Sequence, residues 1–400
     1  MTSAVSGASD PKFAAVKEEF ERNFAERGEV GASVCLSVNG ETLVDLWGGM
    51  ANPETNDPWC EDTISIVFSC SKAATALCAH ILIDRGELNP EALVSEYWPE
   101  FARNGKEKTT VRMMLNHESA LPTLRDPVRP GGFTDWDYMI QRLEDEEAFW
   151  EPGTRNGYHM INFGWTVGEL VRRVSGKSLG TFFREEVAEK TGARFWLGLP
   201  ESEDVHIAPI IPYAPKPDDQ PTEFAIKLLT DPDSIQHKSF MNNGGWDFND
   251  RKSQAAEIGG GGGLSNARGQ VAMYTPLATN DGTLVSHDRL QAMSMVTTAT
   301  QRDATLLIPT RFGPGFMKSM DNRALNAGPG TSVIMGDRAF GHVGAGGSIG
   351  FADPEAGLAF SYTMNQMGSG ILVNDRAQSL IDAAYRSLGY RTNAPGVWVK

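Results

Sequence analysis

Ser69 and Lys72, three residues apart, are the pair in this sequence best suited to nucleophilic chemistry. A serine hydroxyl becomes a useful nucleophile when a neighbouring base takes its proton. Residues i and i+3 share one face of a helix, so the lysine amine can reach the hydroxyl. A free lysine, with a pKa of about 10.4, is a poor base at neutral pH, but burial and a positive helix end lower that pKa. The pair therefore predicts a serine hydrolase with Ser69 as nucleophile and Lys72 as its activating partner.

The Ser-x-x-Lys pattern occurs twice, and its surroundings separate the two matches. Ser9-Asp-Pro-Lys12 lies in a polar terminal segment, which we expect to be mobile. Ser69 instead follows an apolar run and opens an Ala-, Leu- and Ile-rich segment that ends at Gly86, a pattern typical of a buried helix. A serine that only caps a helix favours Glu or Gln three residues later, whereas Lys72 lies where the helix dipole disfavours a positive charge. Catalysis therefore explains the pair better than capping.

Two later segments complete an ordered set with Ser69-Cys-Ser-Lys72. They are Pro152-Gly153-Thr-Arg-Asn-Gly-Tyr158 and Phe340-Gly-His-Val-Gly-Ala-Gly-Gly-Ser348. The set resembles the three motifs of class C β-lactamases, serine D-alanyl peptidases and family VIII carboxylesterases: Ser-x-x-Lys, a tyrosine shortly after Pro-Gly, and a Lys-Thr-Gly-like triplet on a late strand. The resemblance extends over roughly residues 10 to 390.

The resemblance implies a role for each motif residue. Ser69 would attack a carbonyl carbon and become acylated, while Lys72 and Tyr158 share the proton transfers, with either a tyrosinate or a neutral lysine as base. The backbone amides of Ser69 and Ala345 would form the oxyanion hole. Gly344 would let the late strand approach the substrate closely.

Two departures from the family pattern concern the substrate. Met160 stands where lactamases and peptidases usually carry an asparagine that recognises a peptide-like amide, and His342 stands where they usually carry a lysine suited to a carboxylate. A histidine is mostly neutral at pH 7. Met160, His342 and Gly344 are thus expected to contact the substrate, and an uncharged small to medium carboxylic ester fits them best, as in family VIII. The alternatives are a β-lactamase or D-alanyl peptidase of the same superfamily, and a catalytically inactive scaffold or binding protein.

Two segments match the Gly-x-Ser-x-Gly motif of α/β-hydrolases, Gly176-Lys-Ser178-Leu-Gly180 and Gly346-Gly-Ser348-Ile-Gly350. That motif needs a strand before the serine and a helix after it. Ser178 follows a predicted helix, and Ser348 precedes a predicted strand. An α/β-hydrolase is therefore the second enzyme class.

No cofactor or metal is expected from the motifs. The seven histidines show no metal-ligand spacing, and the glycine run 259–263 lacks the Gly-Lys-Ser/Thr ending of a phosphate loop. We interpret that run as close backbone packing or a hinge.

The formal net charge of −15 disfavours nucleic acid and anionic membranes as partners, because both reward a basic surface. The sequence shows no apolar stretch of membrane-spanning length and no signal-peptide pattern, and its four cysteines lack metal spacing. We expect a cytoplasmic protein with a small-molecule substrate, which could form a homo-oligomer.

The β-type segments that must position these residues lie near both ends of the chain, with a helical region between them. Two β-type runs, 31–38 and 41–47, flank Asn39-Gly40, a strong hairpin signal, after a helical pattern over 10–27. A second hairpin, 348–352 and 358–363, precedes a helix near 375–388. The middle of the chain looks helical and loop-rich, with helices over 163–174 and 179–191 and five prolines in 209–221, a candidate lid.

The pattern predicts an α+β fold of the β-lactamase/transpeptidase kind. Strands from both ends of the chain would form one antiparallel sheet flanked by helices. The predicted domains are residues 1–90 with 250–400 for the sheet, and residues 91–249 for an inserted helical region.

Overall fold

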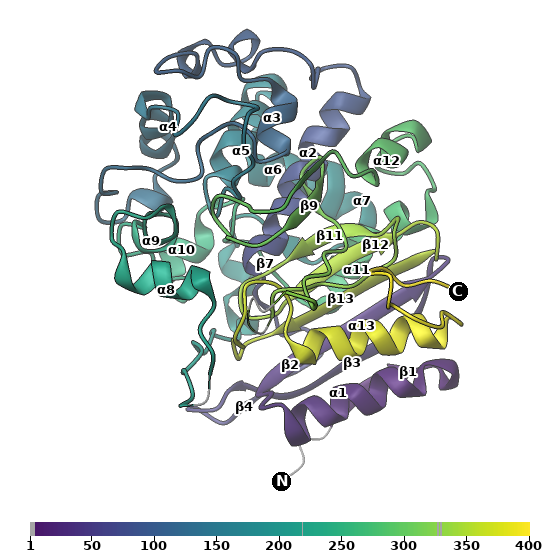
Figure 1. Cartoon of the computed structure of the whole chain (residues 1–400). Helices are drawn as coiled ribbons and strands as arrows, with labels where there is room; N and C mark the ends of the chain where they lie inside the picture. The colour runs from purple at the N-terminus through teal and green to yellow at the C-terminus, as the bar shows by residue number, and fades with distance from the viewer. Residues whose placement is uncertain (1–4, 218, 326–327, 329) are drawn as a thin grey trace.

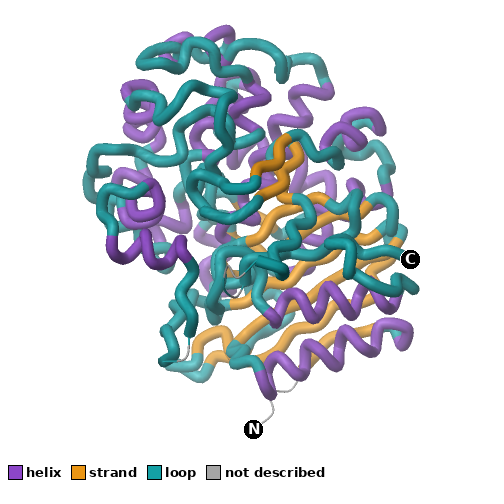
Figure 2. Tube along the Cα trace, viewed as in Figure 1, coloured by secondary structure: helices purple, strands orange, loops and turns teal. Residues whose placement is uncertain are grey.

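A long antiparallel sheet, built from both ends of the chain, organises the computed structural model, which describes residues 5–217, 219–325, 328 and 330–400 (Figures 1 and 2). The strand order is β1-β3-β2-β13-β12-β11-β10-β9-β8, with β4 paired to β3. The strands are β1 (Val5–Ser9), β2 (Gly31–Val38), β3 (Glu41–Asn52), β4 (Asp57–Pro58), β8 (Thr298–Thr300), β9 (Thr310–Gly313), β10 (Phe316–Met317), β11 (Phe340–Val343), β12 (Ile349–Asp353) and β13 (Leu358–Met364). Because β2, near the N-terminus, pairs with β13, the last strand, the two ends of the chain meet in mid-sheet, which confirms the predicted fold class.

Both predicted hairpins are present, and their turns explain them. Asn39 and Gly40 have φ values of 50° and 88°, the left-handed pair that a two-residue hairpin requires. The turn between β12 and β13 is held by Asp353, whose Oδ1 accepts hydrogen bonds from the amides of Glu355 and Ala356. Residue type at the turns therefore sets the register of the central strands.

Helices cover both faces of the sheet (Figure 1). On one face lie α1 (Ala14–Glu26) and α13 (Asp375–Ser387), which pack side by side, and on the other lies α11 (Ala267–Thr279). Large side chains of β13 such as Phe360 join the core on the α1 and α13 side, whereas small ones such as Ala359 face α11. The alternation lets α11 approach the sheet closely.

The other helices gather at one end of the sheet, around α2. They are α2 (Ser71–Asp84), α3 (Val111–Leu115), α4 (Trp136–Asp145), α5 (Phe163–Ser175), α6 (Leu179–Phe183), α7 (Glu189–Thr191), α8 (Glu223–Thr230), α9 (Ile235–Met241), α10 (Arg251–Ala255) and α12 (His287–Met293). The helix predicted over 179–191 is divided, because a five-residue π turn, Arg184–Ala188, separates α6 from α7. α2 packs on α5 and α6, inside a core that includes residues from both predicted domains, and the domain division itself stays a prediction.

A small sheet of β5 (Ser65–Ile66), β7 (Leu264–Ser265) and β6 (Phe195–Trp196) lies directly before the start of α2. β5 pairs with β7, so the segment that leads to Ser69 is joined to the end of the glycine run. No helix in the described ranges has the length and apolarity that crossing a membrane would require.

The expectation that Ser9 lies in a mobile segment is wrong. Ser9 ends β1, which pairs antiparallel with β3 at the edge of the sheet. Gly7 makes this pairing possible, since its φ is +102° and a side chain there would meet the Asp45 carbonyl oxygen at 2.1 Å. The signal-peptide interpretation falls partly on residues 1–4, which lie outside the described residues.

The proline-rich segment 209–221 is joined to the sheet at its start. The Ile211 amide donates to the Asn365 carbonyl oxygen at 2.8 Å, and the Met367 amide donates to the Ile211 carbonyl oxygen at 3.0 Å. These bonds extend the line of β13 by one short parallel bridge. Residue 218 lies outside the described part, and the lid hypothesis stays a prediction.

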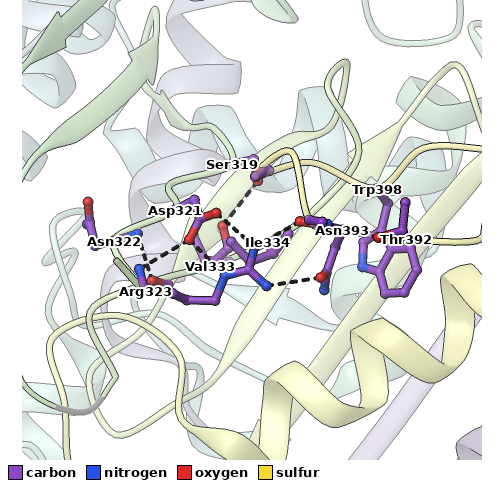
Figure 3. Close-up of polar contacts among 12 residues, drawn as sticks. Ser319, Asp321, Asn322, Arg323, Val333, Ile334, Thr392, Asn393 and Trp398 are labelled. Carbon is purple, nitrogen blue, oxygen red and sulfur yellow. Dashed lines mark hydrogen bonds and ion pairs between the residues drawn. The ribbon is translucent and has the colours of Figure 1, made fainter. Parts of the chain in front are cut away.

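The C-terminal tail is held against the segment that follows β10 (Figure 3). Ser319 Oγ donates to the Gly396 carbonyl oxygen at 2.8 Å. Arg323, paired with Asp321, also donates to the side-chain and backbone oxygens of Asn393 at 3.0 and 2.8 Å. Polar contacts thus fix the last ten residues to the body of the protein.

Candidate active site

Ser69 and Lys72 lie where a short 3-10 turn, Phe68–Cys70, runs into α2. Phe68 has a φ of +44°, an uncommon conformation for a residue with a side chain, and it makes a sharp bend directly before Ser69. The Nζ atom of Lys72 is 2.9 Å from Ser69 Oγ. The structure therefore brings together the two residues that their spacing singles out.

Lys72 is fully buried, and its amine has three polar neighbours. Besides Ser69, these are the carbonyl oxygens of Met160 and Gly260, each at 2.6 Å. Burial lowers the pKa of Lys72 well below its usual range. A neutral amine has two N–H donors and one lone pair, and a carbonyl oxygen can only accept. In the neutral form the two carbonyls would take both donors, which leaves the lone pair for the Ser69 hydroxyl.

The glycine run 259–263 supplies one of these carbonyls because it passes very close to its neighbours. A side chain at Gly260 would meet the Ile161 carbonyl oxygen at 2.1 Å. The preceding carbonyl, of Gly259, accepts a hydrogen bond from Thr75 Oγ1 at 3.0 Å. The run is thus close backbone packing, and its contact with Lys72 was missed by sequence reasoning, although the run itself was a visible signal.

Tyr158 completes a cluster around the amine. Its ring centre lies 4.8 Å from Lys72 Nζ, and its side chain is hydrogen-bonded to Ser69. The tyrosine is buried and packs against the rings of His117 and Phe312, which also contact each other. Burial raises the pKa of Tyr158 above its usual range, so the phenol keeps its proton at neutral pH.

Asp303 holds the backbone of Tyr158 and was not recognised from the sequence. Both of its carboxylate oxygens lie 3.0 Å from the Tyr158 amide. Oδ1 also accepts from the amides of Thr305 and Leu306 at 2.8 Å each. The carboxylate is fully buried, and burial raises its pKa. No local pattern marks an aspartate 145 residues from its partner in the chain.

His342 lies on β11 beside these groups. Its ring centre is 5.9 Å from that of Tyr158, and Nδ1 is 2.7 Å from the Val343 carbonyl oxygen. Nδ1 must therefore carry the proton, which leaves Nε2 as an acceptor, buried and with no hydrogen-bond partner within the described ranges. Burial, with the nearby Lys72, lowers the pKa of His342 to about 3. The third motif thus presents a neutral ring where a lysine would present a charge.

Gly344 brings the end of β11 against the segment before Ser69. A side chain at Gly344 would meet the Val67 carbonyl oxygen at 2.3 Å, so only glycine allows this approach. Ala345 follows at once and packs against the cluster that contains Phe68, the residue before the serine. The Ala345 amide donates no hydrogen bond to any of the described residues. The two amides that the resemblance implies thus come from neighbouring segments.

An apolar cluster adjoins Ser69 through Phe68, the preceding residue. This cluster, which we call the apolar wall, contains Phe68, Trp246, Phe248, Ala345 and Met367. The rings of Phe68 and Phe248 meet edge-on at 5.3 Å, and Trp246 lies beyond them. The Met160 side chain is half-buried against the neighbouring core, while its backbone oxygen contacts Lys72.

The serines of the two Gly-x-Ser-x-Gly segments have structural surroundings that differ from a nucleophile elbow. Ser178 caps α6 and hydrogen-bonds Glu257 at 2.7 Å. Ser348 is fully buried between the turn after β11 and the start of β12. Neither serine stands between a strand and a following helix.

Other candidates for chemistry are absent from the described residues or lie elsewhere. Within residues 5–217, 219–325, 328 and 330–400, no three His, Cys, Asp or Glu side chains gather as a metal site would need. His117 Nδ1 accepts from the His159 amide at 3.1 Å, and His159 Nε2 is 2.8 Å from Ser119 Oγ, so both rings have local partners. Two cavities, of about 450 and 250 Å³, lie beside Trp136, away from Ser69.

Known proteins resemble this chain over nearly its whole length. The model of the Beta-lactamase family matches residues 18–384. Esterase/beta-lactamase LipL of Mycobacterium tuberculosis (strain ATCC 25618 / H37Rv) is 33% identical over 387 residues, which are 93% of this chain and 86% of LipL. A crystal structure of a family VIII carboxylesterase is 35% identical, with a TM-score of 0.83 over 96% of this chain and 100% of that one. A penicillin-binding protein homologue from Caulobacter crescentus is 32% identical, with a TM-score of 0.84 over the same shares.

Proposed function

Because the chain belongs to the β-lactamase family, we propose that it is a serine carboxylesterase that hydrolyses small to medium uncharged esters through an acyl-enzyme on Ser69. The observation that carries the proposal is the buried Lys72 amine, 2.9 Å from Ser69 Oγ, with its two N–H groups committed to carbonyl oxygens. In that arrangement the lone pair of the neutral amine is available to accept the proton of Ser69.

In the first half of the reaction, Ser69 Oγ attacks the ester carbonyl carbon while its proton moves to Lys72. The carbon becomes tetrahedral and its oxygen becomes an anion, which the amides of Ser69 and Ala345 stabilise. Tyr158, still protonated, gives its proton to the leaving alkoxide and regains one from Lys72. The C–O bond breaks, the alcohol leaves, and the acyl group stays on Ser69.

In the second half, water attacks the acyl-enzyme, and the same groups work in reverse. Lys72 and Tyr158 accept the water proton, and Ser69 Oγ leaves with a proton as the carboxylic acid is released. Of the two bases that the family resemblance allows, the pKa directions of Lys72 and Tyr158 favour the neutral lysine over a tyrosinate.

The preference for an uncharged ester rests on what faces the substrate. The apolar wall offers no charge, and His342 is neutral where a carboxylate-binding lysine would stand. Met160 supplies no side-chain amide for a peptide group. Gly344 lets these residues come close to the reacting carbonyl.

A substrate panel tests the proposal. We expect p-nitrophenyl acetate and butyrate to be hydrolysed with kcat/KM values well above those for nitrocefin and for a D-alanyl-D-alanine peptide. The printed name of the relative LipL includes both activities, so slow nitrocefin turnover is compatible with the proposal. Nitrocefin turnover well above that of the short esters would instead indicate a β-lactamase, and no turnover of any of them would indicate a binding protein.

A further inference from the structure

The turn that follows β11 is made almost entirely of glycine. It runs from Gly344 to Gly347 and has one internal hydrogen bond, from the Gly347 amide to the Gly344 carbonyl oxygen at 3.1 Å. Gly346 and Gly347 have φ values of +85° and +119°. Glycine backbones have many accessible conformations. The direction of the Ala345 amide within this turn must therefore be fixed by groups outside it.

Two such groups converge on the Gly346 carbonyl oxygen. The Gly368 amide and the Asn374 side chain, through Nδ2, each donate to it at 2.9 Å. Asn374 is the residue that caps α13, and its Oδ1 accepts from the Arg376 amide at 3.2 Å. The two ends of the side chain cannot be exchanged, because the amide can only donate and the carbonyl can only accept.

The space around the Asn374 amide is shaped to receive it. A side chain at Gly347 would lie 2.5 Å from Asn374 Nδ2, and one at Gly368 would lie 2.2 Å from it. The glycines on both sides therefore leave room for one planar amide group. Asn374 thus connects the turn directly to the first turn of a 13-residue helix.

We propose that Asn374 is a positioning residue for the oxyanion hole, holding the Ala345 amide in its productive direction through the Gly346 carbonyl. The inference rests on the proposed function, in which that amide stabilises the anionic oxygen. Asp, Ser and Asn cap helices about equally well. Aspartate has no donor, and serine has a single oxygen, one bond nearer the backbone, so only asparagine places a separate acceptor atom at the helix and a donor atom at the turn.

The test compares Asn374→Ser with Asn266→Ser. Serine keeps the cap on α13, but its single oxygen lies on Cβ, so it does not also fill the place of Nδ2 against the Gly346 carbonyl oxygen. Asn266 is a matched control, because it caps α11 through the Gly269 amide at 2.9 Å and does not contact the turn. Removing an oxyanion donor outright costs on the order of 10²–10³ in kcat, so a loosened donor should cost about tenfold.

For Asn374→Ser we expect kcat for p-nitrophenyl butyrate to fall about tenfold with KM little changed, and the Ki of a boronic acid transition-state analogue to rise by a similar factor. Asn374→Asp, which caps the helix but points a carboxylate at a carbonyl, should lose at least as much. Asn266→Ser should match the wild type in both constants.

Wild-type kcat and Ki in Asn374→Ser would overturn the inference. So would a loss of activity that only follows the loss of folded protein, with Ki unchanged. Failure of the proposed function would look different, because Ser69→Ala would then keep esterase activity whatever Asn374 does.

Discussion

At the scale of single residues, the chemistry depends on how completely Lys72 is buried. The helix start disfavours a positive charge at that position, but loss of water is the larger influence on its pKa. Burial favours the neutral form of Lys72, and a neutral amine is the base that a serine nucleophile needs.

The pH dependence of the reaction should report Lys72. Since the neutral amine is the active form, kcat/KM should rise with pH through the lowered pKa of Lys72 and level off well below 10.5, the usual lysine value. Lys72→Met should abolish activity, and Tyr158→Phe should lower kcat but leave the acid limb in place. An acid limb that disappears in Tyr158→Phe would identify the tyrosine as the base.

Asp303 should act through Tyr158. In Asp303→Asn, the side-chain NH₂ would face the Tyr158 amide, donor against donor, so we expect kcat to fall about tenfold and stability to fall by about 1–3 kcal/mol. In a Tyr158→Phe background, the same change should cost little further activity, because the group it positions is already gone. Fully additive losses in kcat would contradict this role.

The sequence was sufficient to single out Ser69, Lys72 and Tyr158, which the structure brings together, because each lies in a motif whose spacing is local. It was not sufficient for Asp303 or for the carbonyl of Gly260. Both act on residues far away in the chain. Asp303 binds a backbone amide, and Gly260 contributes its backbone carbonyl, so neither contact leaves a residue-type pattern in the sequence.

At the scale of elements, the site depends on close approaches that only glycine permits. The glycine run presses against α5 and its preceding turn, and Gly344 presses against the segment before Ser69. Turn chemistry made both hairpins predictable. The π turn between α6 and α7 was not, because its sequence continues a helical pattern.

Two alanine substitutions in the glycine run should separate backbone from side-chain crowding. At Gly260 a Cβ would meet a backbone oxygen at 2.1 Å, whereas at Gly261 it would meet the end of the Ile161 side chain at 3.1 Å. We expect Gly260→Ala to cost about 3 kcal/mol in urea unfolding and Gly261→Ala to cost less than about 1 kcal/mol. Equal costs would show that the approach at Gly260 is not tight.

At the scale of the whole molecule, one sheet joins both ends of the chain and carries the third motif to the start of α2. The predicted sheet was correct in its central strands, whose alternation and turns are strong. β8, β9 and β10 were not predicted, because they are only two to four residues long, and β9 and β10 also contain or adjoin glycine or proline, so only pairing makes them strands.

The C-terminal tail should matter for stability and not for turnover. Trp398 is buried, stacks on Tyr385 and donates through Nε1 to Asp382 at 3.2 Å. Trp398→Ala should cost about 3–5 kcal/mol in unfolding free energy. Because the tail packs on α13 and the segment after β10, kcat/KM per folded enzyme should stay at the wild-type value; a large fall would show that the tail also shapes the site.

The most direct test of the account is to locate the acyl-enzyme serine. Reaction with a fluorophosphonate, followed by peptide mass spectrometry, should place the label on Ser69 in the wild type. Ser69→Ala should take up no label and hydrolyse no ester, while Ser348→Ala and Ser178→Ala should both be labelled and active. Label on Ser348 or Ser178, or an active Ser69→Ala variant, would contradict the account.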